Sequence, residues 1–538
     1  MRQKRNVSLI LLPLVIAVSI IAGVVIGGVL SHQRLSPAEQ KLRDVLGLVN
    51  ATYVDDVNVD SLLESVLPDL LASLDPHSAY IPASELTAAN EDLAGSFSGV
   101  GVTFQILNDT VTVMEVVPGG PAEKVGLQSG DRILKANGKK MAGVGITNDD
   151  VFKNLRGKKN TKVALEIRRG NGKVLKFDVV RGDVPVNSVD CVYMIADGVG
   201  FIKVSKFART TYDEFINALG KLKLQGAKKF IIDLRDNSGG YMDQAIYMAN
   251  EFLPAGKMIV YTKGRMPENE TMGVSDGTGS FQDSELVVLT NEFSASASEI
   301  FAGAIQDNDR GLVIGRRTFG KGLVQNQTDL RDGSAVRLTV ARYFTPSGRS
   351  IQKEYKRGLD GKYQLDIIDR YNHGEFYSRD SIRQDKSKLF HTGNGREVYG
   401  GGGIMPDIFV PEDTTGYSTY YINLVNSGLV QKFAFELTDR YRSLFKVART
   451  SEQLEEIMPS DDVLVNTFMA YAVKNGEKAR WYYVNLAYNQ LVRQIKGMII
   501  RDVLGYEACY QYLNKEDKLV IQALEELRKG HSPTNIMK

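Results

Sequence analysis

Cysteine is scarce in this sequence, and the two signs of charge are nearly balanced. The 538 residues include only Cys191 and Cys509, too few for a disulfide scaffold and without the spacing of a zinc site. Lysine and arginine number 66 against 64 aspartates and glutamates, so the net charge of +2 gives no global field that would attract nucleic acid or an acidic substrate. A polypeptide substrate fits this composition better, and we expect no nucleic-acid partner, no cofactor and no metal ion.

Histidine is also rare, with five residues at positions 32, 77, 373, 391 and 531. None lies in the serine or lysine motifs described below, which disfavours a Ser-His-Asp triad, although distant residues can converge in a fold. His77, in the turn Asp75–Pro82, is a candidate catalytic base. A lone histidine in a turn is more often structural, and we favour that interpretation.

Charged residues are absent from Val7 to Leu30, a run long enough to cross a hydrocarbon core of roughly 30 Å as a helix. Arg2, Lys4 and Arg5 precede it, so the positive-inside rule places everything after the run outside the cytoplasm. A cleaved signal peptide is the alternative, but the run exceeds the usual apolar region of about 7 to 15 residues and no A-x-A-like site follows. We expect an uncleaved single-pass anchor in the inner (cytoplasmic) membrane of a bacterial cell envelope, with the catalytic portion on the periplasmic or extracytoplasmic side.

The rest of the chain divides by residue pattern, as its length predicts. Helical spacing of apolar residues marks both terminal regions, and the apolar stripes of the C-terminal region would pack within the chain or form a homodimer. A polar stretch with little hydrophobic periodicity is typical of a surface loop. The expected units are 1–35 (cytoplasmic stub and anchor), 36–94 (helical), 95–182 (β-rich), 183–412 (layered α/β, with the polar insertion 353–398) and 413–538 (helical).

The β-rich unit carries a glycine pattern that suits peptide binding. Backbone N–H groups spaced by glycines can surround a terminal carboxylate, while the adjoining strand edge accepts the peptide by β-augmentation. A G-x-G-x pattern alone also fits a tight turn. The order of strand, Pro-Gly-Gly-Pro helix entry and Gly-Asp turn resembles a PDZ domain, which implies a ligand with a free, apolar C-terminus. The residues at the carboxylate-binding position are Gly99, Val100, Gly101 and Val102.

An apolar strand, Lys229–Leu234, leads into a glycine turn and then into a helix that begins near Met242. Exposed N–H groups of Gly239 and Gly240, beside the start of that helix, can stabilise a developing oxyanion. An ordinary turn between a strand and a helix would have the same pattern.

Three serines, Ser294, Ser296 and Ser298, lie between the strand Glu285–Thr290 and a helix that continues to Asp307. The start of a helix favours the negative charge formed in acyl transfer, which makes Ser296 a candidate nucleophile. Ser294 and Ser298 would instead cap the helix, because serine is a preferred N-cap residue.

Lys321 follows within the glycine-rich stretch Thr318–Gln325. A lysine acts as a general base only if its pKa falls several units below about 10.4, which burial against Phe319 and Leu323 would achieve. If this stretch is helical, Gln325 lies on the same face and would orient the amine. An isolated lysine is usually a solvated surface charge, and the serine cluster is what favours the base.

From Ser36 to about Pro411 the sequence resembles the C-terminal processing peptidases, also called tail-specific proteases. The Asp75–Tyr80 loop, the PDZ unit and the spacing of the serine and lysine motifs carry the resemblance. It implies a multidomain α+β chain with a ClpP/crotonase-like α/β protease core behind the PDZ domain. It also implies Ser296 as nucleophile, Lys321 as general base and Gln325 as the residue that orients the lysine.

The same resemblance implies an oxyanion hole made by the Ala297 N–H and an N–H of Gly239 or Gly240. Asp307 matches an acidic position discussed for some members. We interpret it as structural, because a carboxylate beside Lys321 would hold the amine charged. The implied activity is that of a serine endopeptidase with a Ser-Lys dyad that forms an acyl-enzyme.

In this family the PDZ domain captures substrate C-termini and can obstruct or expose the proteolytic groove. Arg156, near the end of the PDZ unit, is a candidate for the charged contact that holds the open state. This hypothesis rests on placement, and a solvated arginine in a turn is the alternative. An Arg156→Ala variant whose peptide-stimulated activity is unchanged would contradict the regulatory role.

Two other classes of protein fit parts of the sequence. One is a membrane-tethered PDZ adaptor with an inactive protease domain, which the intact set of Ser296, Lys321 and Gln325 disfavours. The other is a crotonase-like acyl enzyme, for which no acyl-carrier-binding motif stands out. A second copy of the chain and an accessory adaptor protein are further partners that the sequence allows.

Overall fold

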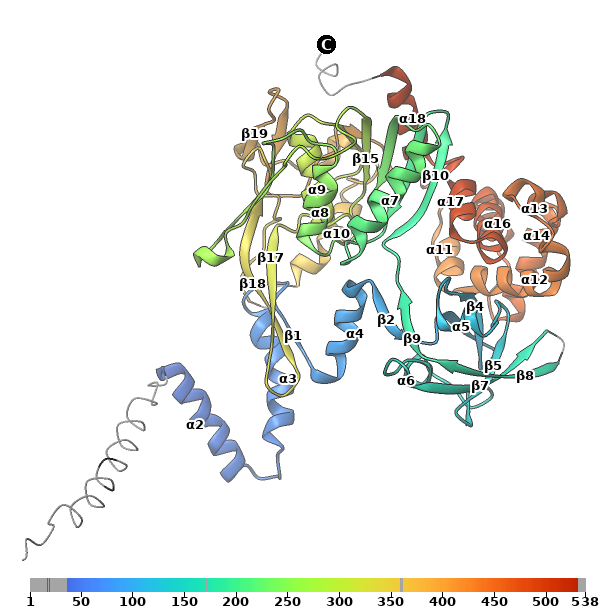
Figure 1. Ribbon diagram of the computed structural model, residues 1–538, viewed down its shortest axis with the longest axis horizontal. Coiled ribbons are helices and arrows are strands. Elements are labelled where there is room, and N and C mark those ends of the chain that lie inside the picture. Colours follow the sequence, from blue (N-terminus) through green and yellow to red (C-terminus); the bar gives the residue numbers. More distant parts are fainter. Residues whose placement is uncertain (1–16, 18, 20–35, 171, 359–360, 531–538) are drawn as a thin grey trace, which may run out of the picture. The chain divides into compact units, whose positions relative to one another are not determined.

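The computed structural model describes residues 17, 19, 36–170, 172–358 and 361–530 (Figure 1). The expected anchor at residues 7–30 therefore lies outside the described residues, apart from positions 17 and 19. Within the described ranges, no helix combines the length and the apolar character needed to span a bilayer. The chain forms two compact units, residues 1–71 and 72–538.

The first unit is helical, as predicted, and contains α2 (Pro37–Thr52) and α3 (Val59–Ala72, whose last residue belongs to the second unit). A capping box starts α2: the Ser36 hydroxyl accepts the Glu39 N–H, and the Glu39 carboxylate accepts the Ser36 N–H. These bonds satisfy two N–H groups that the first turn of a helix leaves unpaired.

The β-rich part of the second unit is built on an antiparallel sheet in the order β3-β4-β5-β7-β8, with β6 paired to β5. Its core consists of alternating apolar residues that face two helices, with Val111, Ile133 and Val163 fully buried. The strands are β3 (Val102–Leu107), β4 (Thr110–Val116), β5 (Arg132–Ala136), β6 (Lys139–Lys140), β7 (Lys162–Arg169) and β8 (Lys173–Val180), and the helices are α5 (Pro121–Lys124) and α6 (Asn148–Leu155). A separate antiparallel pair joins β2 (Ser96–Gly99) to β9 (Gly182–Pro185), and α4 (Ala83–Ala94) precedes β2.

The α/β core is a six-stranded sheet in the order β10-β11-β12-β15-β16-β21, parallel except for the β10–β11 pair. Near-continuous apolar strands such as β12 indicate burial on both faces, and helices cover both. One face packs on α7, α8 and α9, and the other on α18 near the C-terminus (Figure 1). The elements are β10 (Val189–Ala196), β11 (Val199–Val204), α7 (Thr211–Leu224), β12 (Lys229–Asp233), α8 (Met242–Asn250), β15 (Glu285–Thr290), α9 (Ala297–Asp307), β16 (Leu312–Gly315), β21 (Ile408–Phe409) and α18 (Lys518–Lys529).

A second sheet of the core has the order β1-β18-β13-β14, with β17 also paired to β18. The first of these strands follows the Asp75–Pro76–His77–Ser78 segment, so its antiparallel pairing with β18 fixes that segment beside the core. The strands are β1 (Ala79–Ile81), β13 (Met258–Gly264), β14 (Met272–Val274), β17 (Leu323–Asp329) and β18 (Ala335–Phe344), and a short 3-10 helix spans Pro267–Asn269.

The polar insertion 353–398 is not the loop that its weak periodicity predicted. It contains α10 (Lys362–Asn372), the strand pair β19 (Leu389–His391) and β20 (Glu397–Tyr399), and 3-10 turns at Arg379–Ser381 and Lys386–Lys388. Buried ion pairs organise it: Glu375 binds Arg370 at 2.8 Å and Arg317 at 2.6 Å. The prediction was wrong because it used apolar periodicity, and this segment is held in place by charged side chains.

The C-terminal region is helical, as predicted, and packs within the chain. Its first seven helices share an apolar core of their own. They are α11 (Thr419–Asn426), α12 (Leu429–Phe445), α13 (Ser451–Ile457), α14 (Asp461–Lys474), α15 (Trp481–Leu486), α16 (Tyr488–Leu504) and α17 (Tyr506–Asn514). The eighth helix, α18, packs against the core sheet through Leu519, Val520 and Leu527. Cys191 and Cys509 are both free thiols.

Candidate active site

Ser296 occupies a strained backbone position at the N-terminus of α9. Its φ of 55° and ψ of −113° are unusual for a residue with a side chain. Such a conformation costs about 1 to 3 kcal/mol and persists only when surrounding contacts enforce it. Strain of this kind, at the junction of a strand and a helix, is typical of a residue presented for reaction.

The Glu299 carboxylate enforces this position. Its Oε2 accepts the N–H of Ser296 at 2.9 Å and the N–H of Lys321 at 2.8 Å, so one oxygen joins the two candidate catalytic residues. Its Oε1 accepts the Gly320 N–H at 2.7 Å and the Thr318 hydroxyl at 2.5 Å. Glu299 is fully buried, and burial raises the pKa of its carboxyl to about 7, against the opposing effect of these donors.

The Tyr343 hydroxyl makes a second link between the same two residues. It donates to the carbonyl oxygens of Ser296, at 3.1 Å, and of Lys321. Tyr343 lies on β18 and is almost wholly buried, so this link is shielded from water. Glu299 and Tyr343 together hold the serine and lysine backbones around one point.

Lys321 has the environment that a general base requires. Among the described residues, its ammonium group has no hydrogen bond and no ion pair. Burial lowers the pKa of Lys321, and the positive charge of Arg337 lowers it further. Both effects favour the neutral amine, which can accept a proton.

The glycine turn lies directly against Ser296, because a Cβ on Gly239 would come 2.6 Å from the Ser296 Cβ and 2.9 Å from the Ala297 N. The Gly239 N–H is already donated to Asn237 Oδ1 at 2.8 Å. The N–H groups of Gly240 and Ala297 have no acceptor among the described residues. Of the two glycines, Gly240 is therefore the better partner for Ala297 in an oxyanion hole.

The serines flanking Ser296 do not cap α9, contrary to the prediction. Their hydroxyls point away from the helix: Ser294 Oγ donates to the Leu234 carbonyl at 2.8 Å, and Ser298 Oγ donates to the Asn237 carbonyl, also at 2.8 Å. They therefore fasten the segment that carries Ser296 to the glycine turn and the strand before it. Asp307 is structural in this fold, since it is buried against Arg349 at 2.7 Å and accepts the Ser347 hydroxyl.

Gln325 lies on strand β17, so the helical alternative is wrong. Its amide nitrogen contacts Thr339 Oγ1 at 3.4 Å, and that hydroxyl donates to Asp75 Oδ1 at 3.0 Å. No hydrogen bond joins the side chains of Gln325 and Lys321 in the described part of the chain. The structure thus connects Gln325 to the Asp75 turn rather than to the amine.

His77 is closer to the site than its sequence position suggests. Its Nε2 bonds the Tyr363 hydroxyl at 2.7 Å. Burial lowers the pKa of His77 to about 4, and the positive charges of Lys321 and Lys353 add to this. The imidazole is therefore neutral at neutral pH and is held by an aromatic partner, which agrees with a structural role.

The PDZ-like unit contains an apolar groove of about 330 Å³ between β3 and α6. Val100, Gly101 and Val102 line it, whereas Gly99 pairs with Gly182 at the end of β2. The N–H groups of Val100 and Gly101 have no acceptor among the described residues. This arrangement suits a terminal carboxylate followed by an apolar side chain.

Arg156 lies at the edge of this groove rather than in free solvent. Its guanidinium pairs with Glu91 of α4 at 2.8 Å and lies 4.5 Å from the ring centroid of Phe97 and 4.7 Å from that of Phe152. Its Nε is buried without a hydrogen-bond partner in the described residues. Arg156 thus joins the groove to the helix that precedes the PDZ-like unit.

Two parts of the chain match models of known protein families. The model of the PDZ domain matches residues 92–168, and that of peptidase family S41 matches residues 198–362. The carboxy-terminal processing protease CtpA of Bacillus subtilis (strain 168) is 33% identical over 330 residues, which cover 61% of this chain and 69% of that protein. The chain belongs to peptidase family S41.

Two further relatives match over different shares of their length, and the chain spans less than two thirds of the first. A probable CtpA-like serine protease of Staphylococcus aureus (strain MRSA252) is 35% identical over 312 residues, 58% of this chain and 62% of that protein. The solved photosystem II D1 C-terminal processing protease is 26% identical, covering 71% of this chain and 95% of that chain, with a TM-score of 0.35. Residues 420–505, in the C-terminal helices, match a family of unknown function, DUF8443.

Sequence reasoning missed Glu299 and Tyr343 as organisers of the site. Glu299 is three residues from Ser296, but its bonds to Gly320 and Lys321 cross a gap of more than 20 residues that no local pattern reports. Tyr343 lies farther away still. A buried acid at the third position of a helix is the one signal that could have directed attention to Glu299.

A Glu299→Gln substitution is expected to lower the free energy of unfolding by about 2 to 4 kcal/mol. The glutamine amide has the same shape but only one acceptor oxygen. Its NH₂ group therefore faces N–H or hydroxyl donors that lose their acceptor, and each buried donor without an acceptor costs about 1 to 3 kcal/mol. Urea unfolding measures the change. Glu456→Gln, the same substitution at an exposed position of α13, is the control and should differ from wild type by less than about 0.5 kcal/mol. A Glu299→Gln protein as stable as this control would contradict the bridging role.

Proposed function

We propose that this chain is a membrane-anchored serine endopeptidase with a Ser-Lys dyad, which cleaves exported polypeptides selected by their C-termini. The observation that carries the proposal is that Ser296 and Lys321 bind the same oxygen of Glu299, next to two unpaired N–H groups. Family membership and the names of the relatives support the same chemistry.

In the proposed mechanism, neutral Lys321 takes the proton of the Ser296 hydroxyl as Ser296 Oγ attacks a peptide carbonyl carbon. The N–H groups of Ala297 and Gly240 hold the resulting oxyanion. When the C–N bond breaks, the Lys321 ammonium gives its proton to the leaving amine. Lys321 then activates a water molecule that releases the acyl group from Ser296. The link from Gln325 through Thr339 to Asp75 is the route by which Gln325 supports this site in the proposal.

The PDZ domain supplies substrate selection in this proposal. The N–H groups of Val100 and Gly101, which have no acceptor among the described residues, donate to the terminal carboxylate, and Phe104 and Phe152 contact an apolar terminal side chain. When a C-terminus occupies the groove, Arg156 transmits the binding to α4 through its ion pair with Glu91. The uncharged run Val7–Leu30 supports an anchor in the inner membrane of a bacterial envelope, with the protease on the outer side of that membrane.

The full chain is expected to degrade an unfolded protein with a free apolar C-terminus about tenfold faster than the same protein with an amidated C-terminus. Loss of the carboxylate removes one or two charge-assisted hydrogen bonds of about 1.5 to 3 kcal/mol each. Gel-based degradation rates at sub-saturating substrate measure the ratio. Equal rates for the two substrates would exclude selection through the PDZ groove, and no cleavage of either would refute the peptidase assignment.

A further inference from the structure

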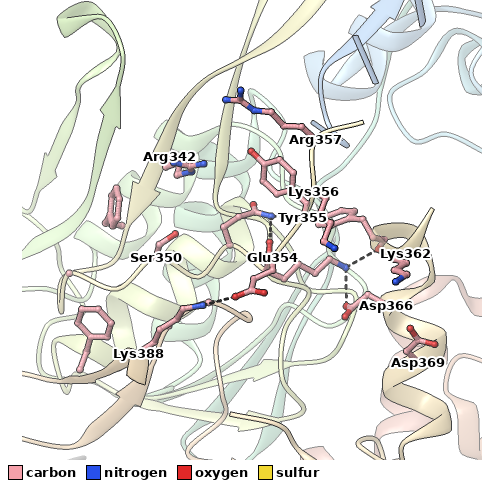
Figure 2. Close-up of a pocket in the computed structure, with 18 residues that line it drawn as sticks. Arg342, Ser350, Glu354, Tyr355, Lys356, Arg357, Lys362, Asp366, Asp369 and Lys388 are labelled. Carbon is pink, nitrogen blue, oxygen red and sulfur yellow. Dashed lines mark hydrogen bonds and ion pairs between the residues drawn. The ribbon is translucent and has the colours of Figure 1, made fainter. Parts of the chain in front are cut away.

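A second cavity adjoins the loop that carries Lys321. The segment after β18 runs along this loop: the Lys353 N–H donates to the Gly320 carbonyl at 2.9 Å, and Gln352 Oε1 accepts the Gly322 N–H at 2.8 Å. Gln352 and Lys353 form one wall of a cavity of about 900 Å³ (Figure 2). A polypeptide held at Ser296 therefore has this cavity within reach.

The cavity is cationic, although the chain as a whole is nearly neutral. Three carboxylates and six cationic side chains line it, a net charge of +3. Two ion pairs involve Lys353 with Asp366, at 2.9 Å, and Lys388 with Glu354, at 3.0 Å, drawn as dashed lines in Figure 2. The lining charges are Arg342, Lys353, Lys356, Arg357, Lys362 and Lys388, with Glu354, Asp366 and Asp369.

The cationic side chains of the cavity differ in whether they are already bound to other groups of the protein. Lys353 is buried, with its ammonium 3.9 Å from the ring centroid of Phe319 and 4.2 Å from that of Tyr363, in addition to its ion pair. Arg342, Lys356 and Arg357 are exposed and take part in no ion pair among the described residues. Figure 2 shows Arg342 on β18 and the other two on the segment before α10. These three side chains remain available to a ligand.

Much of the cavity lies outside the part of the chain that matches the S41 model. That match ends at residue 362, whereas Asp366 and Asp369 of α10, Lys388 and Phe390 lie beyond it. The same insertion supplies Tyr363, whose hydroxyl bonds His77 Nε2 at 2.7 Å. The insertion thus forms one wall of the cavity and also contacts His77, near the candidate active site.

We propose that this cavity is a substrate subsite that binds an acidic segment of the polypeptide close to the bond that is cleaved. The proposal rests on the proposed function, because it takes the ligand to be the polypeptide held at Ser296. Arg342 and Arg357 offer planar groups that bind carboxylates with two parallel hydrogen bonds, and Lys356 adds a third positive charge. Tyr355, Phe344 and Phe390 supply apolar surface for the neighbouring residues of the same segment.

The test uses internally quenched peptides that share one apolar free C-terminus and differ only in a Glu-Glu or Gln-Gln pair, placed at successive positions along the peptide. The wild-type full chain is expected to cleave the Glu-Glu peptide with a kcat/KM about tenfold higher than its Gln-Gln counterpart at one or two neighbouring positions. The preference should fall as salt is raised, since the cations are exposed. Equal kcat/KM values for every pair would overturn the proposal.

The double variant Lys356→Glu/Arg357→Glu reverses two of the three available charges and should bring the Glu-Glu to Gln-Gln ratio to one or below. The matched control, Lys432→Glu/Lys474→Glu, makes the same charge change on exposed positions of α12 and α14 and should keep the wild-type ratio. A ratio that survives in the Lys356/Arg357 variant refutes the subsite. If the wild type cleaves no peptide of the set, the proposed function fails first, which separates the two failures.

Discussion

Replacing Lys321 by methionine is expected to lower kcat/KM by about 10³-fold or more and to leave the chain folded. General base catalysis by a positioned side chain contributes about 10² to 10⁴-fold, and the proposed mechanism assigns this role to Lys321 alone. Methionine has nearly the same length and is apolar, so it suits the buried position of Lys321. Cleavage of the quenched peptides measures the loss, and circular dichroism checks the fold.

The same residue determines the pH dependence. Because burial lowers the pKa of Lys321 below its usual 10.5, the wild-type kcat/KM should rise with pH and level off before pH 10.5 is reached. Between the two pKa values the unfolded chain binds more protons at this site than the folded chain, so Lys321 makes the stability increase with pH in that window. Below the lowered pKa the buried charge destabilises the fold. The Lys321→Met protein should therefore be more stable than wild type at neutral pH and lose this advantage towards pH 10.5.

Two further variants separate base chemistry from charge. Lys321→Arg keeps the positive charge but cannot deprotonate, and it should be as inactive as Lys321→Met. Lys446→Met, the same substitution at an exposed position after α12, should retain wild-type kcat/KM. Substantial activity in Lys321→Arg would show that the lysine acts through its charge and would refute the dyad.

The sequence carries a signal for those parts of the candidate site that lie within one turn or one strand-to-helix junction. Ser296, Ala297 and the turn with Gly239 and Gly240 each lie at such a junction, where the pattern of apolar residues and glycines fixes the local backbone. The sequence predicted a lowered pKa for Lys321 from burial, and burial is the main cause of the lowering in the structure, whereas the contribution of Arg337 could not be read from the sequence. The roles of Glu299 and Tyr343 depend on contacts between distant segments, and neither periodicity nor composition reports those contacts.

The errors have a common physical origin. Gln325 was placed by helical spacing, but its stretch pairs with β18, and a strand partner 14 residues away cannot be read from four residues of sequence. Ser294 and Ser298 were taken for helix caps because serine prefers that position, yet both hydroxyls bond carbonyls of the neighbouring strand and turn. In each case a tertiary contact replaced the locally favoured one.

The C-terminal region shows the same limit at the level of domains. Its helices are evident from apolar spacing, but the spacing does not indicate which of them belongs to the protease core. Helix α18 packs on the core sheet. Asp517, directly before this helix, forms an ion pair at 2.7 Å with Arg235, the first residue of the glycine turn. The end of the chain therefore supports the turn that carries Gly240.

Replacing Ser296 by alanine or by glycine is expected to abolish cleavage, with a fall in kcat of about 10⁴-fold or more, because no other hydroxyl lies in the same position. Both variants keep the backbone N–H that binds Glu299. Single-turnover assays with the quenched peptides measure the loss. Ser443→Ala, the same substitution at an exposed position of α12, is the control and should retain wild-type activity.

The two inactive variants should differ in stability, and the difference tests the strained backbone. Alanine keeps the unfavourable φ of 55° at Ser296, whereas glycine adopts it freely. Relief of about 1 to 3 kcal/mol of strain exceeds the roughly 0.5 to 1 kcal/mol of extra chain entropy that glycine brings, so Ser296→Gly should unfold at higher urea than Ser296→Ala, by about 1 kcal/mol. Equal stability would mean that the serine is not held in a strained conformation, and an active Ser296→Gly protein would exclude Ser296 as the nucleophile.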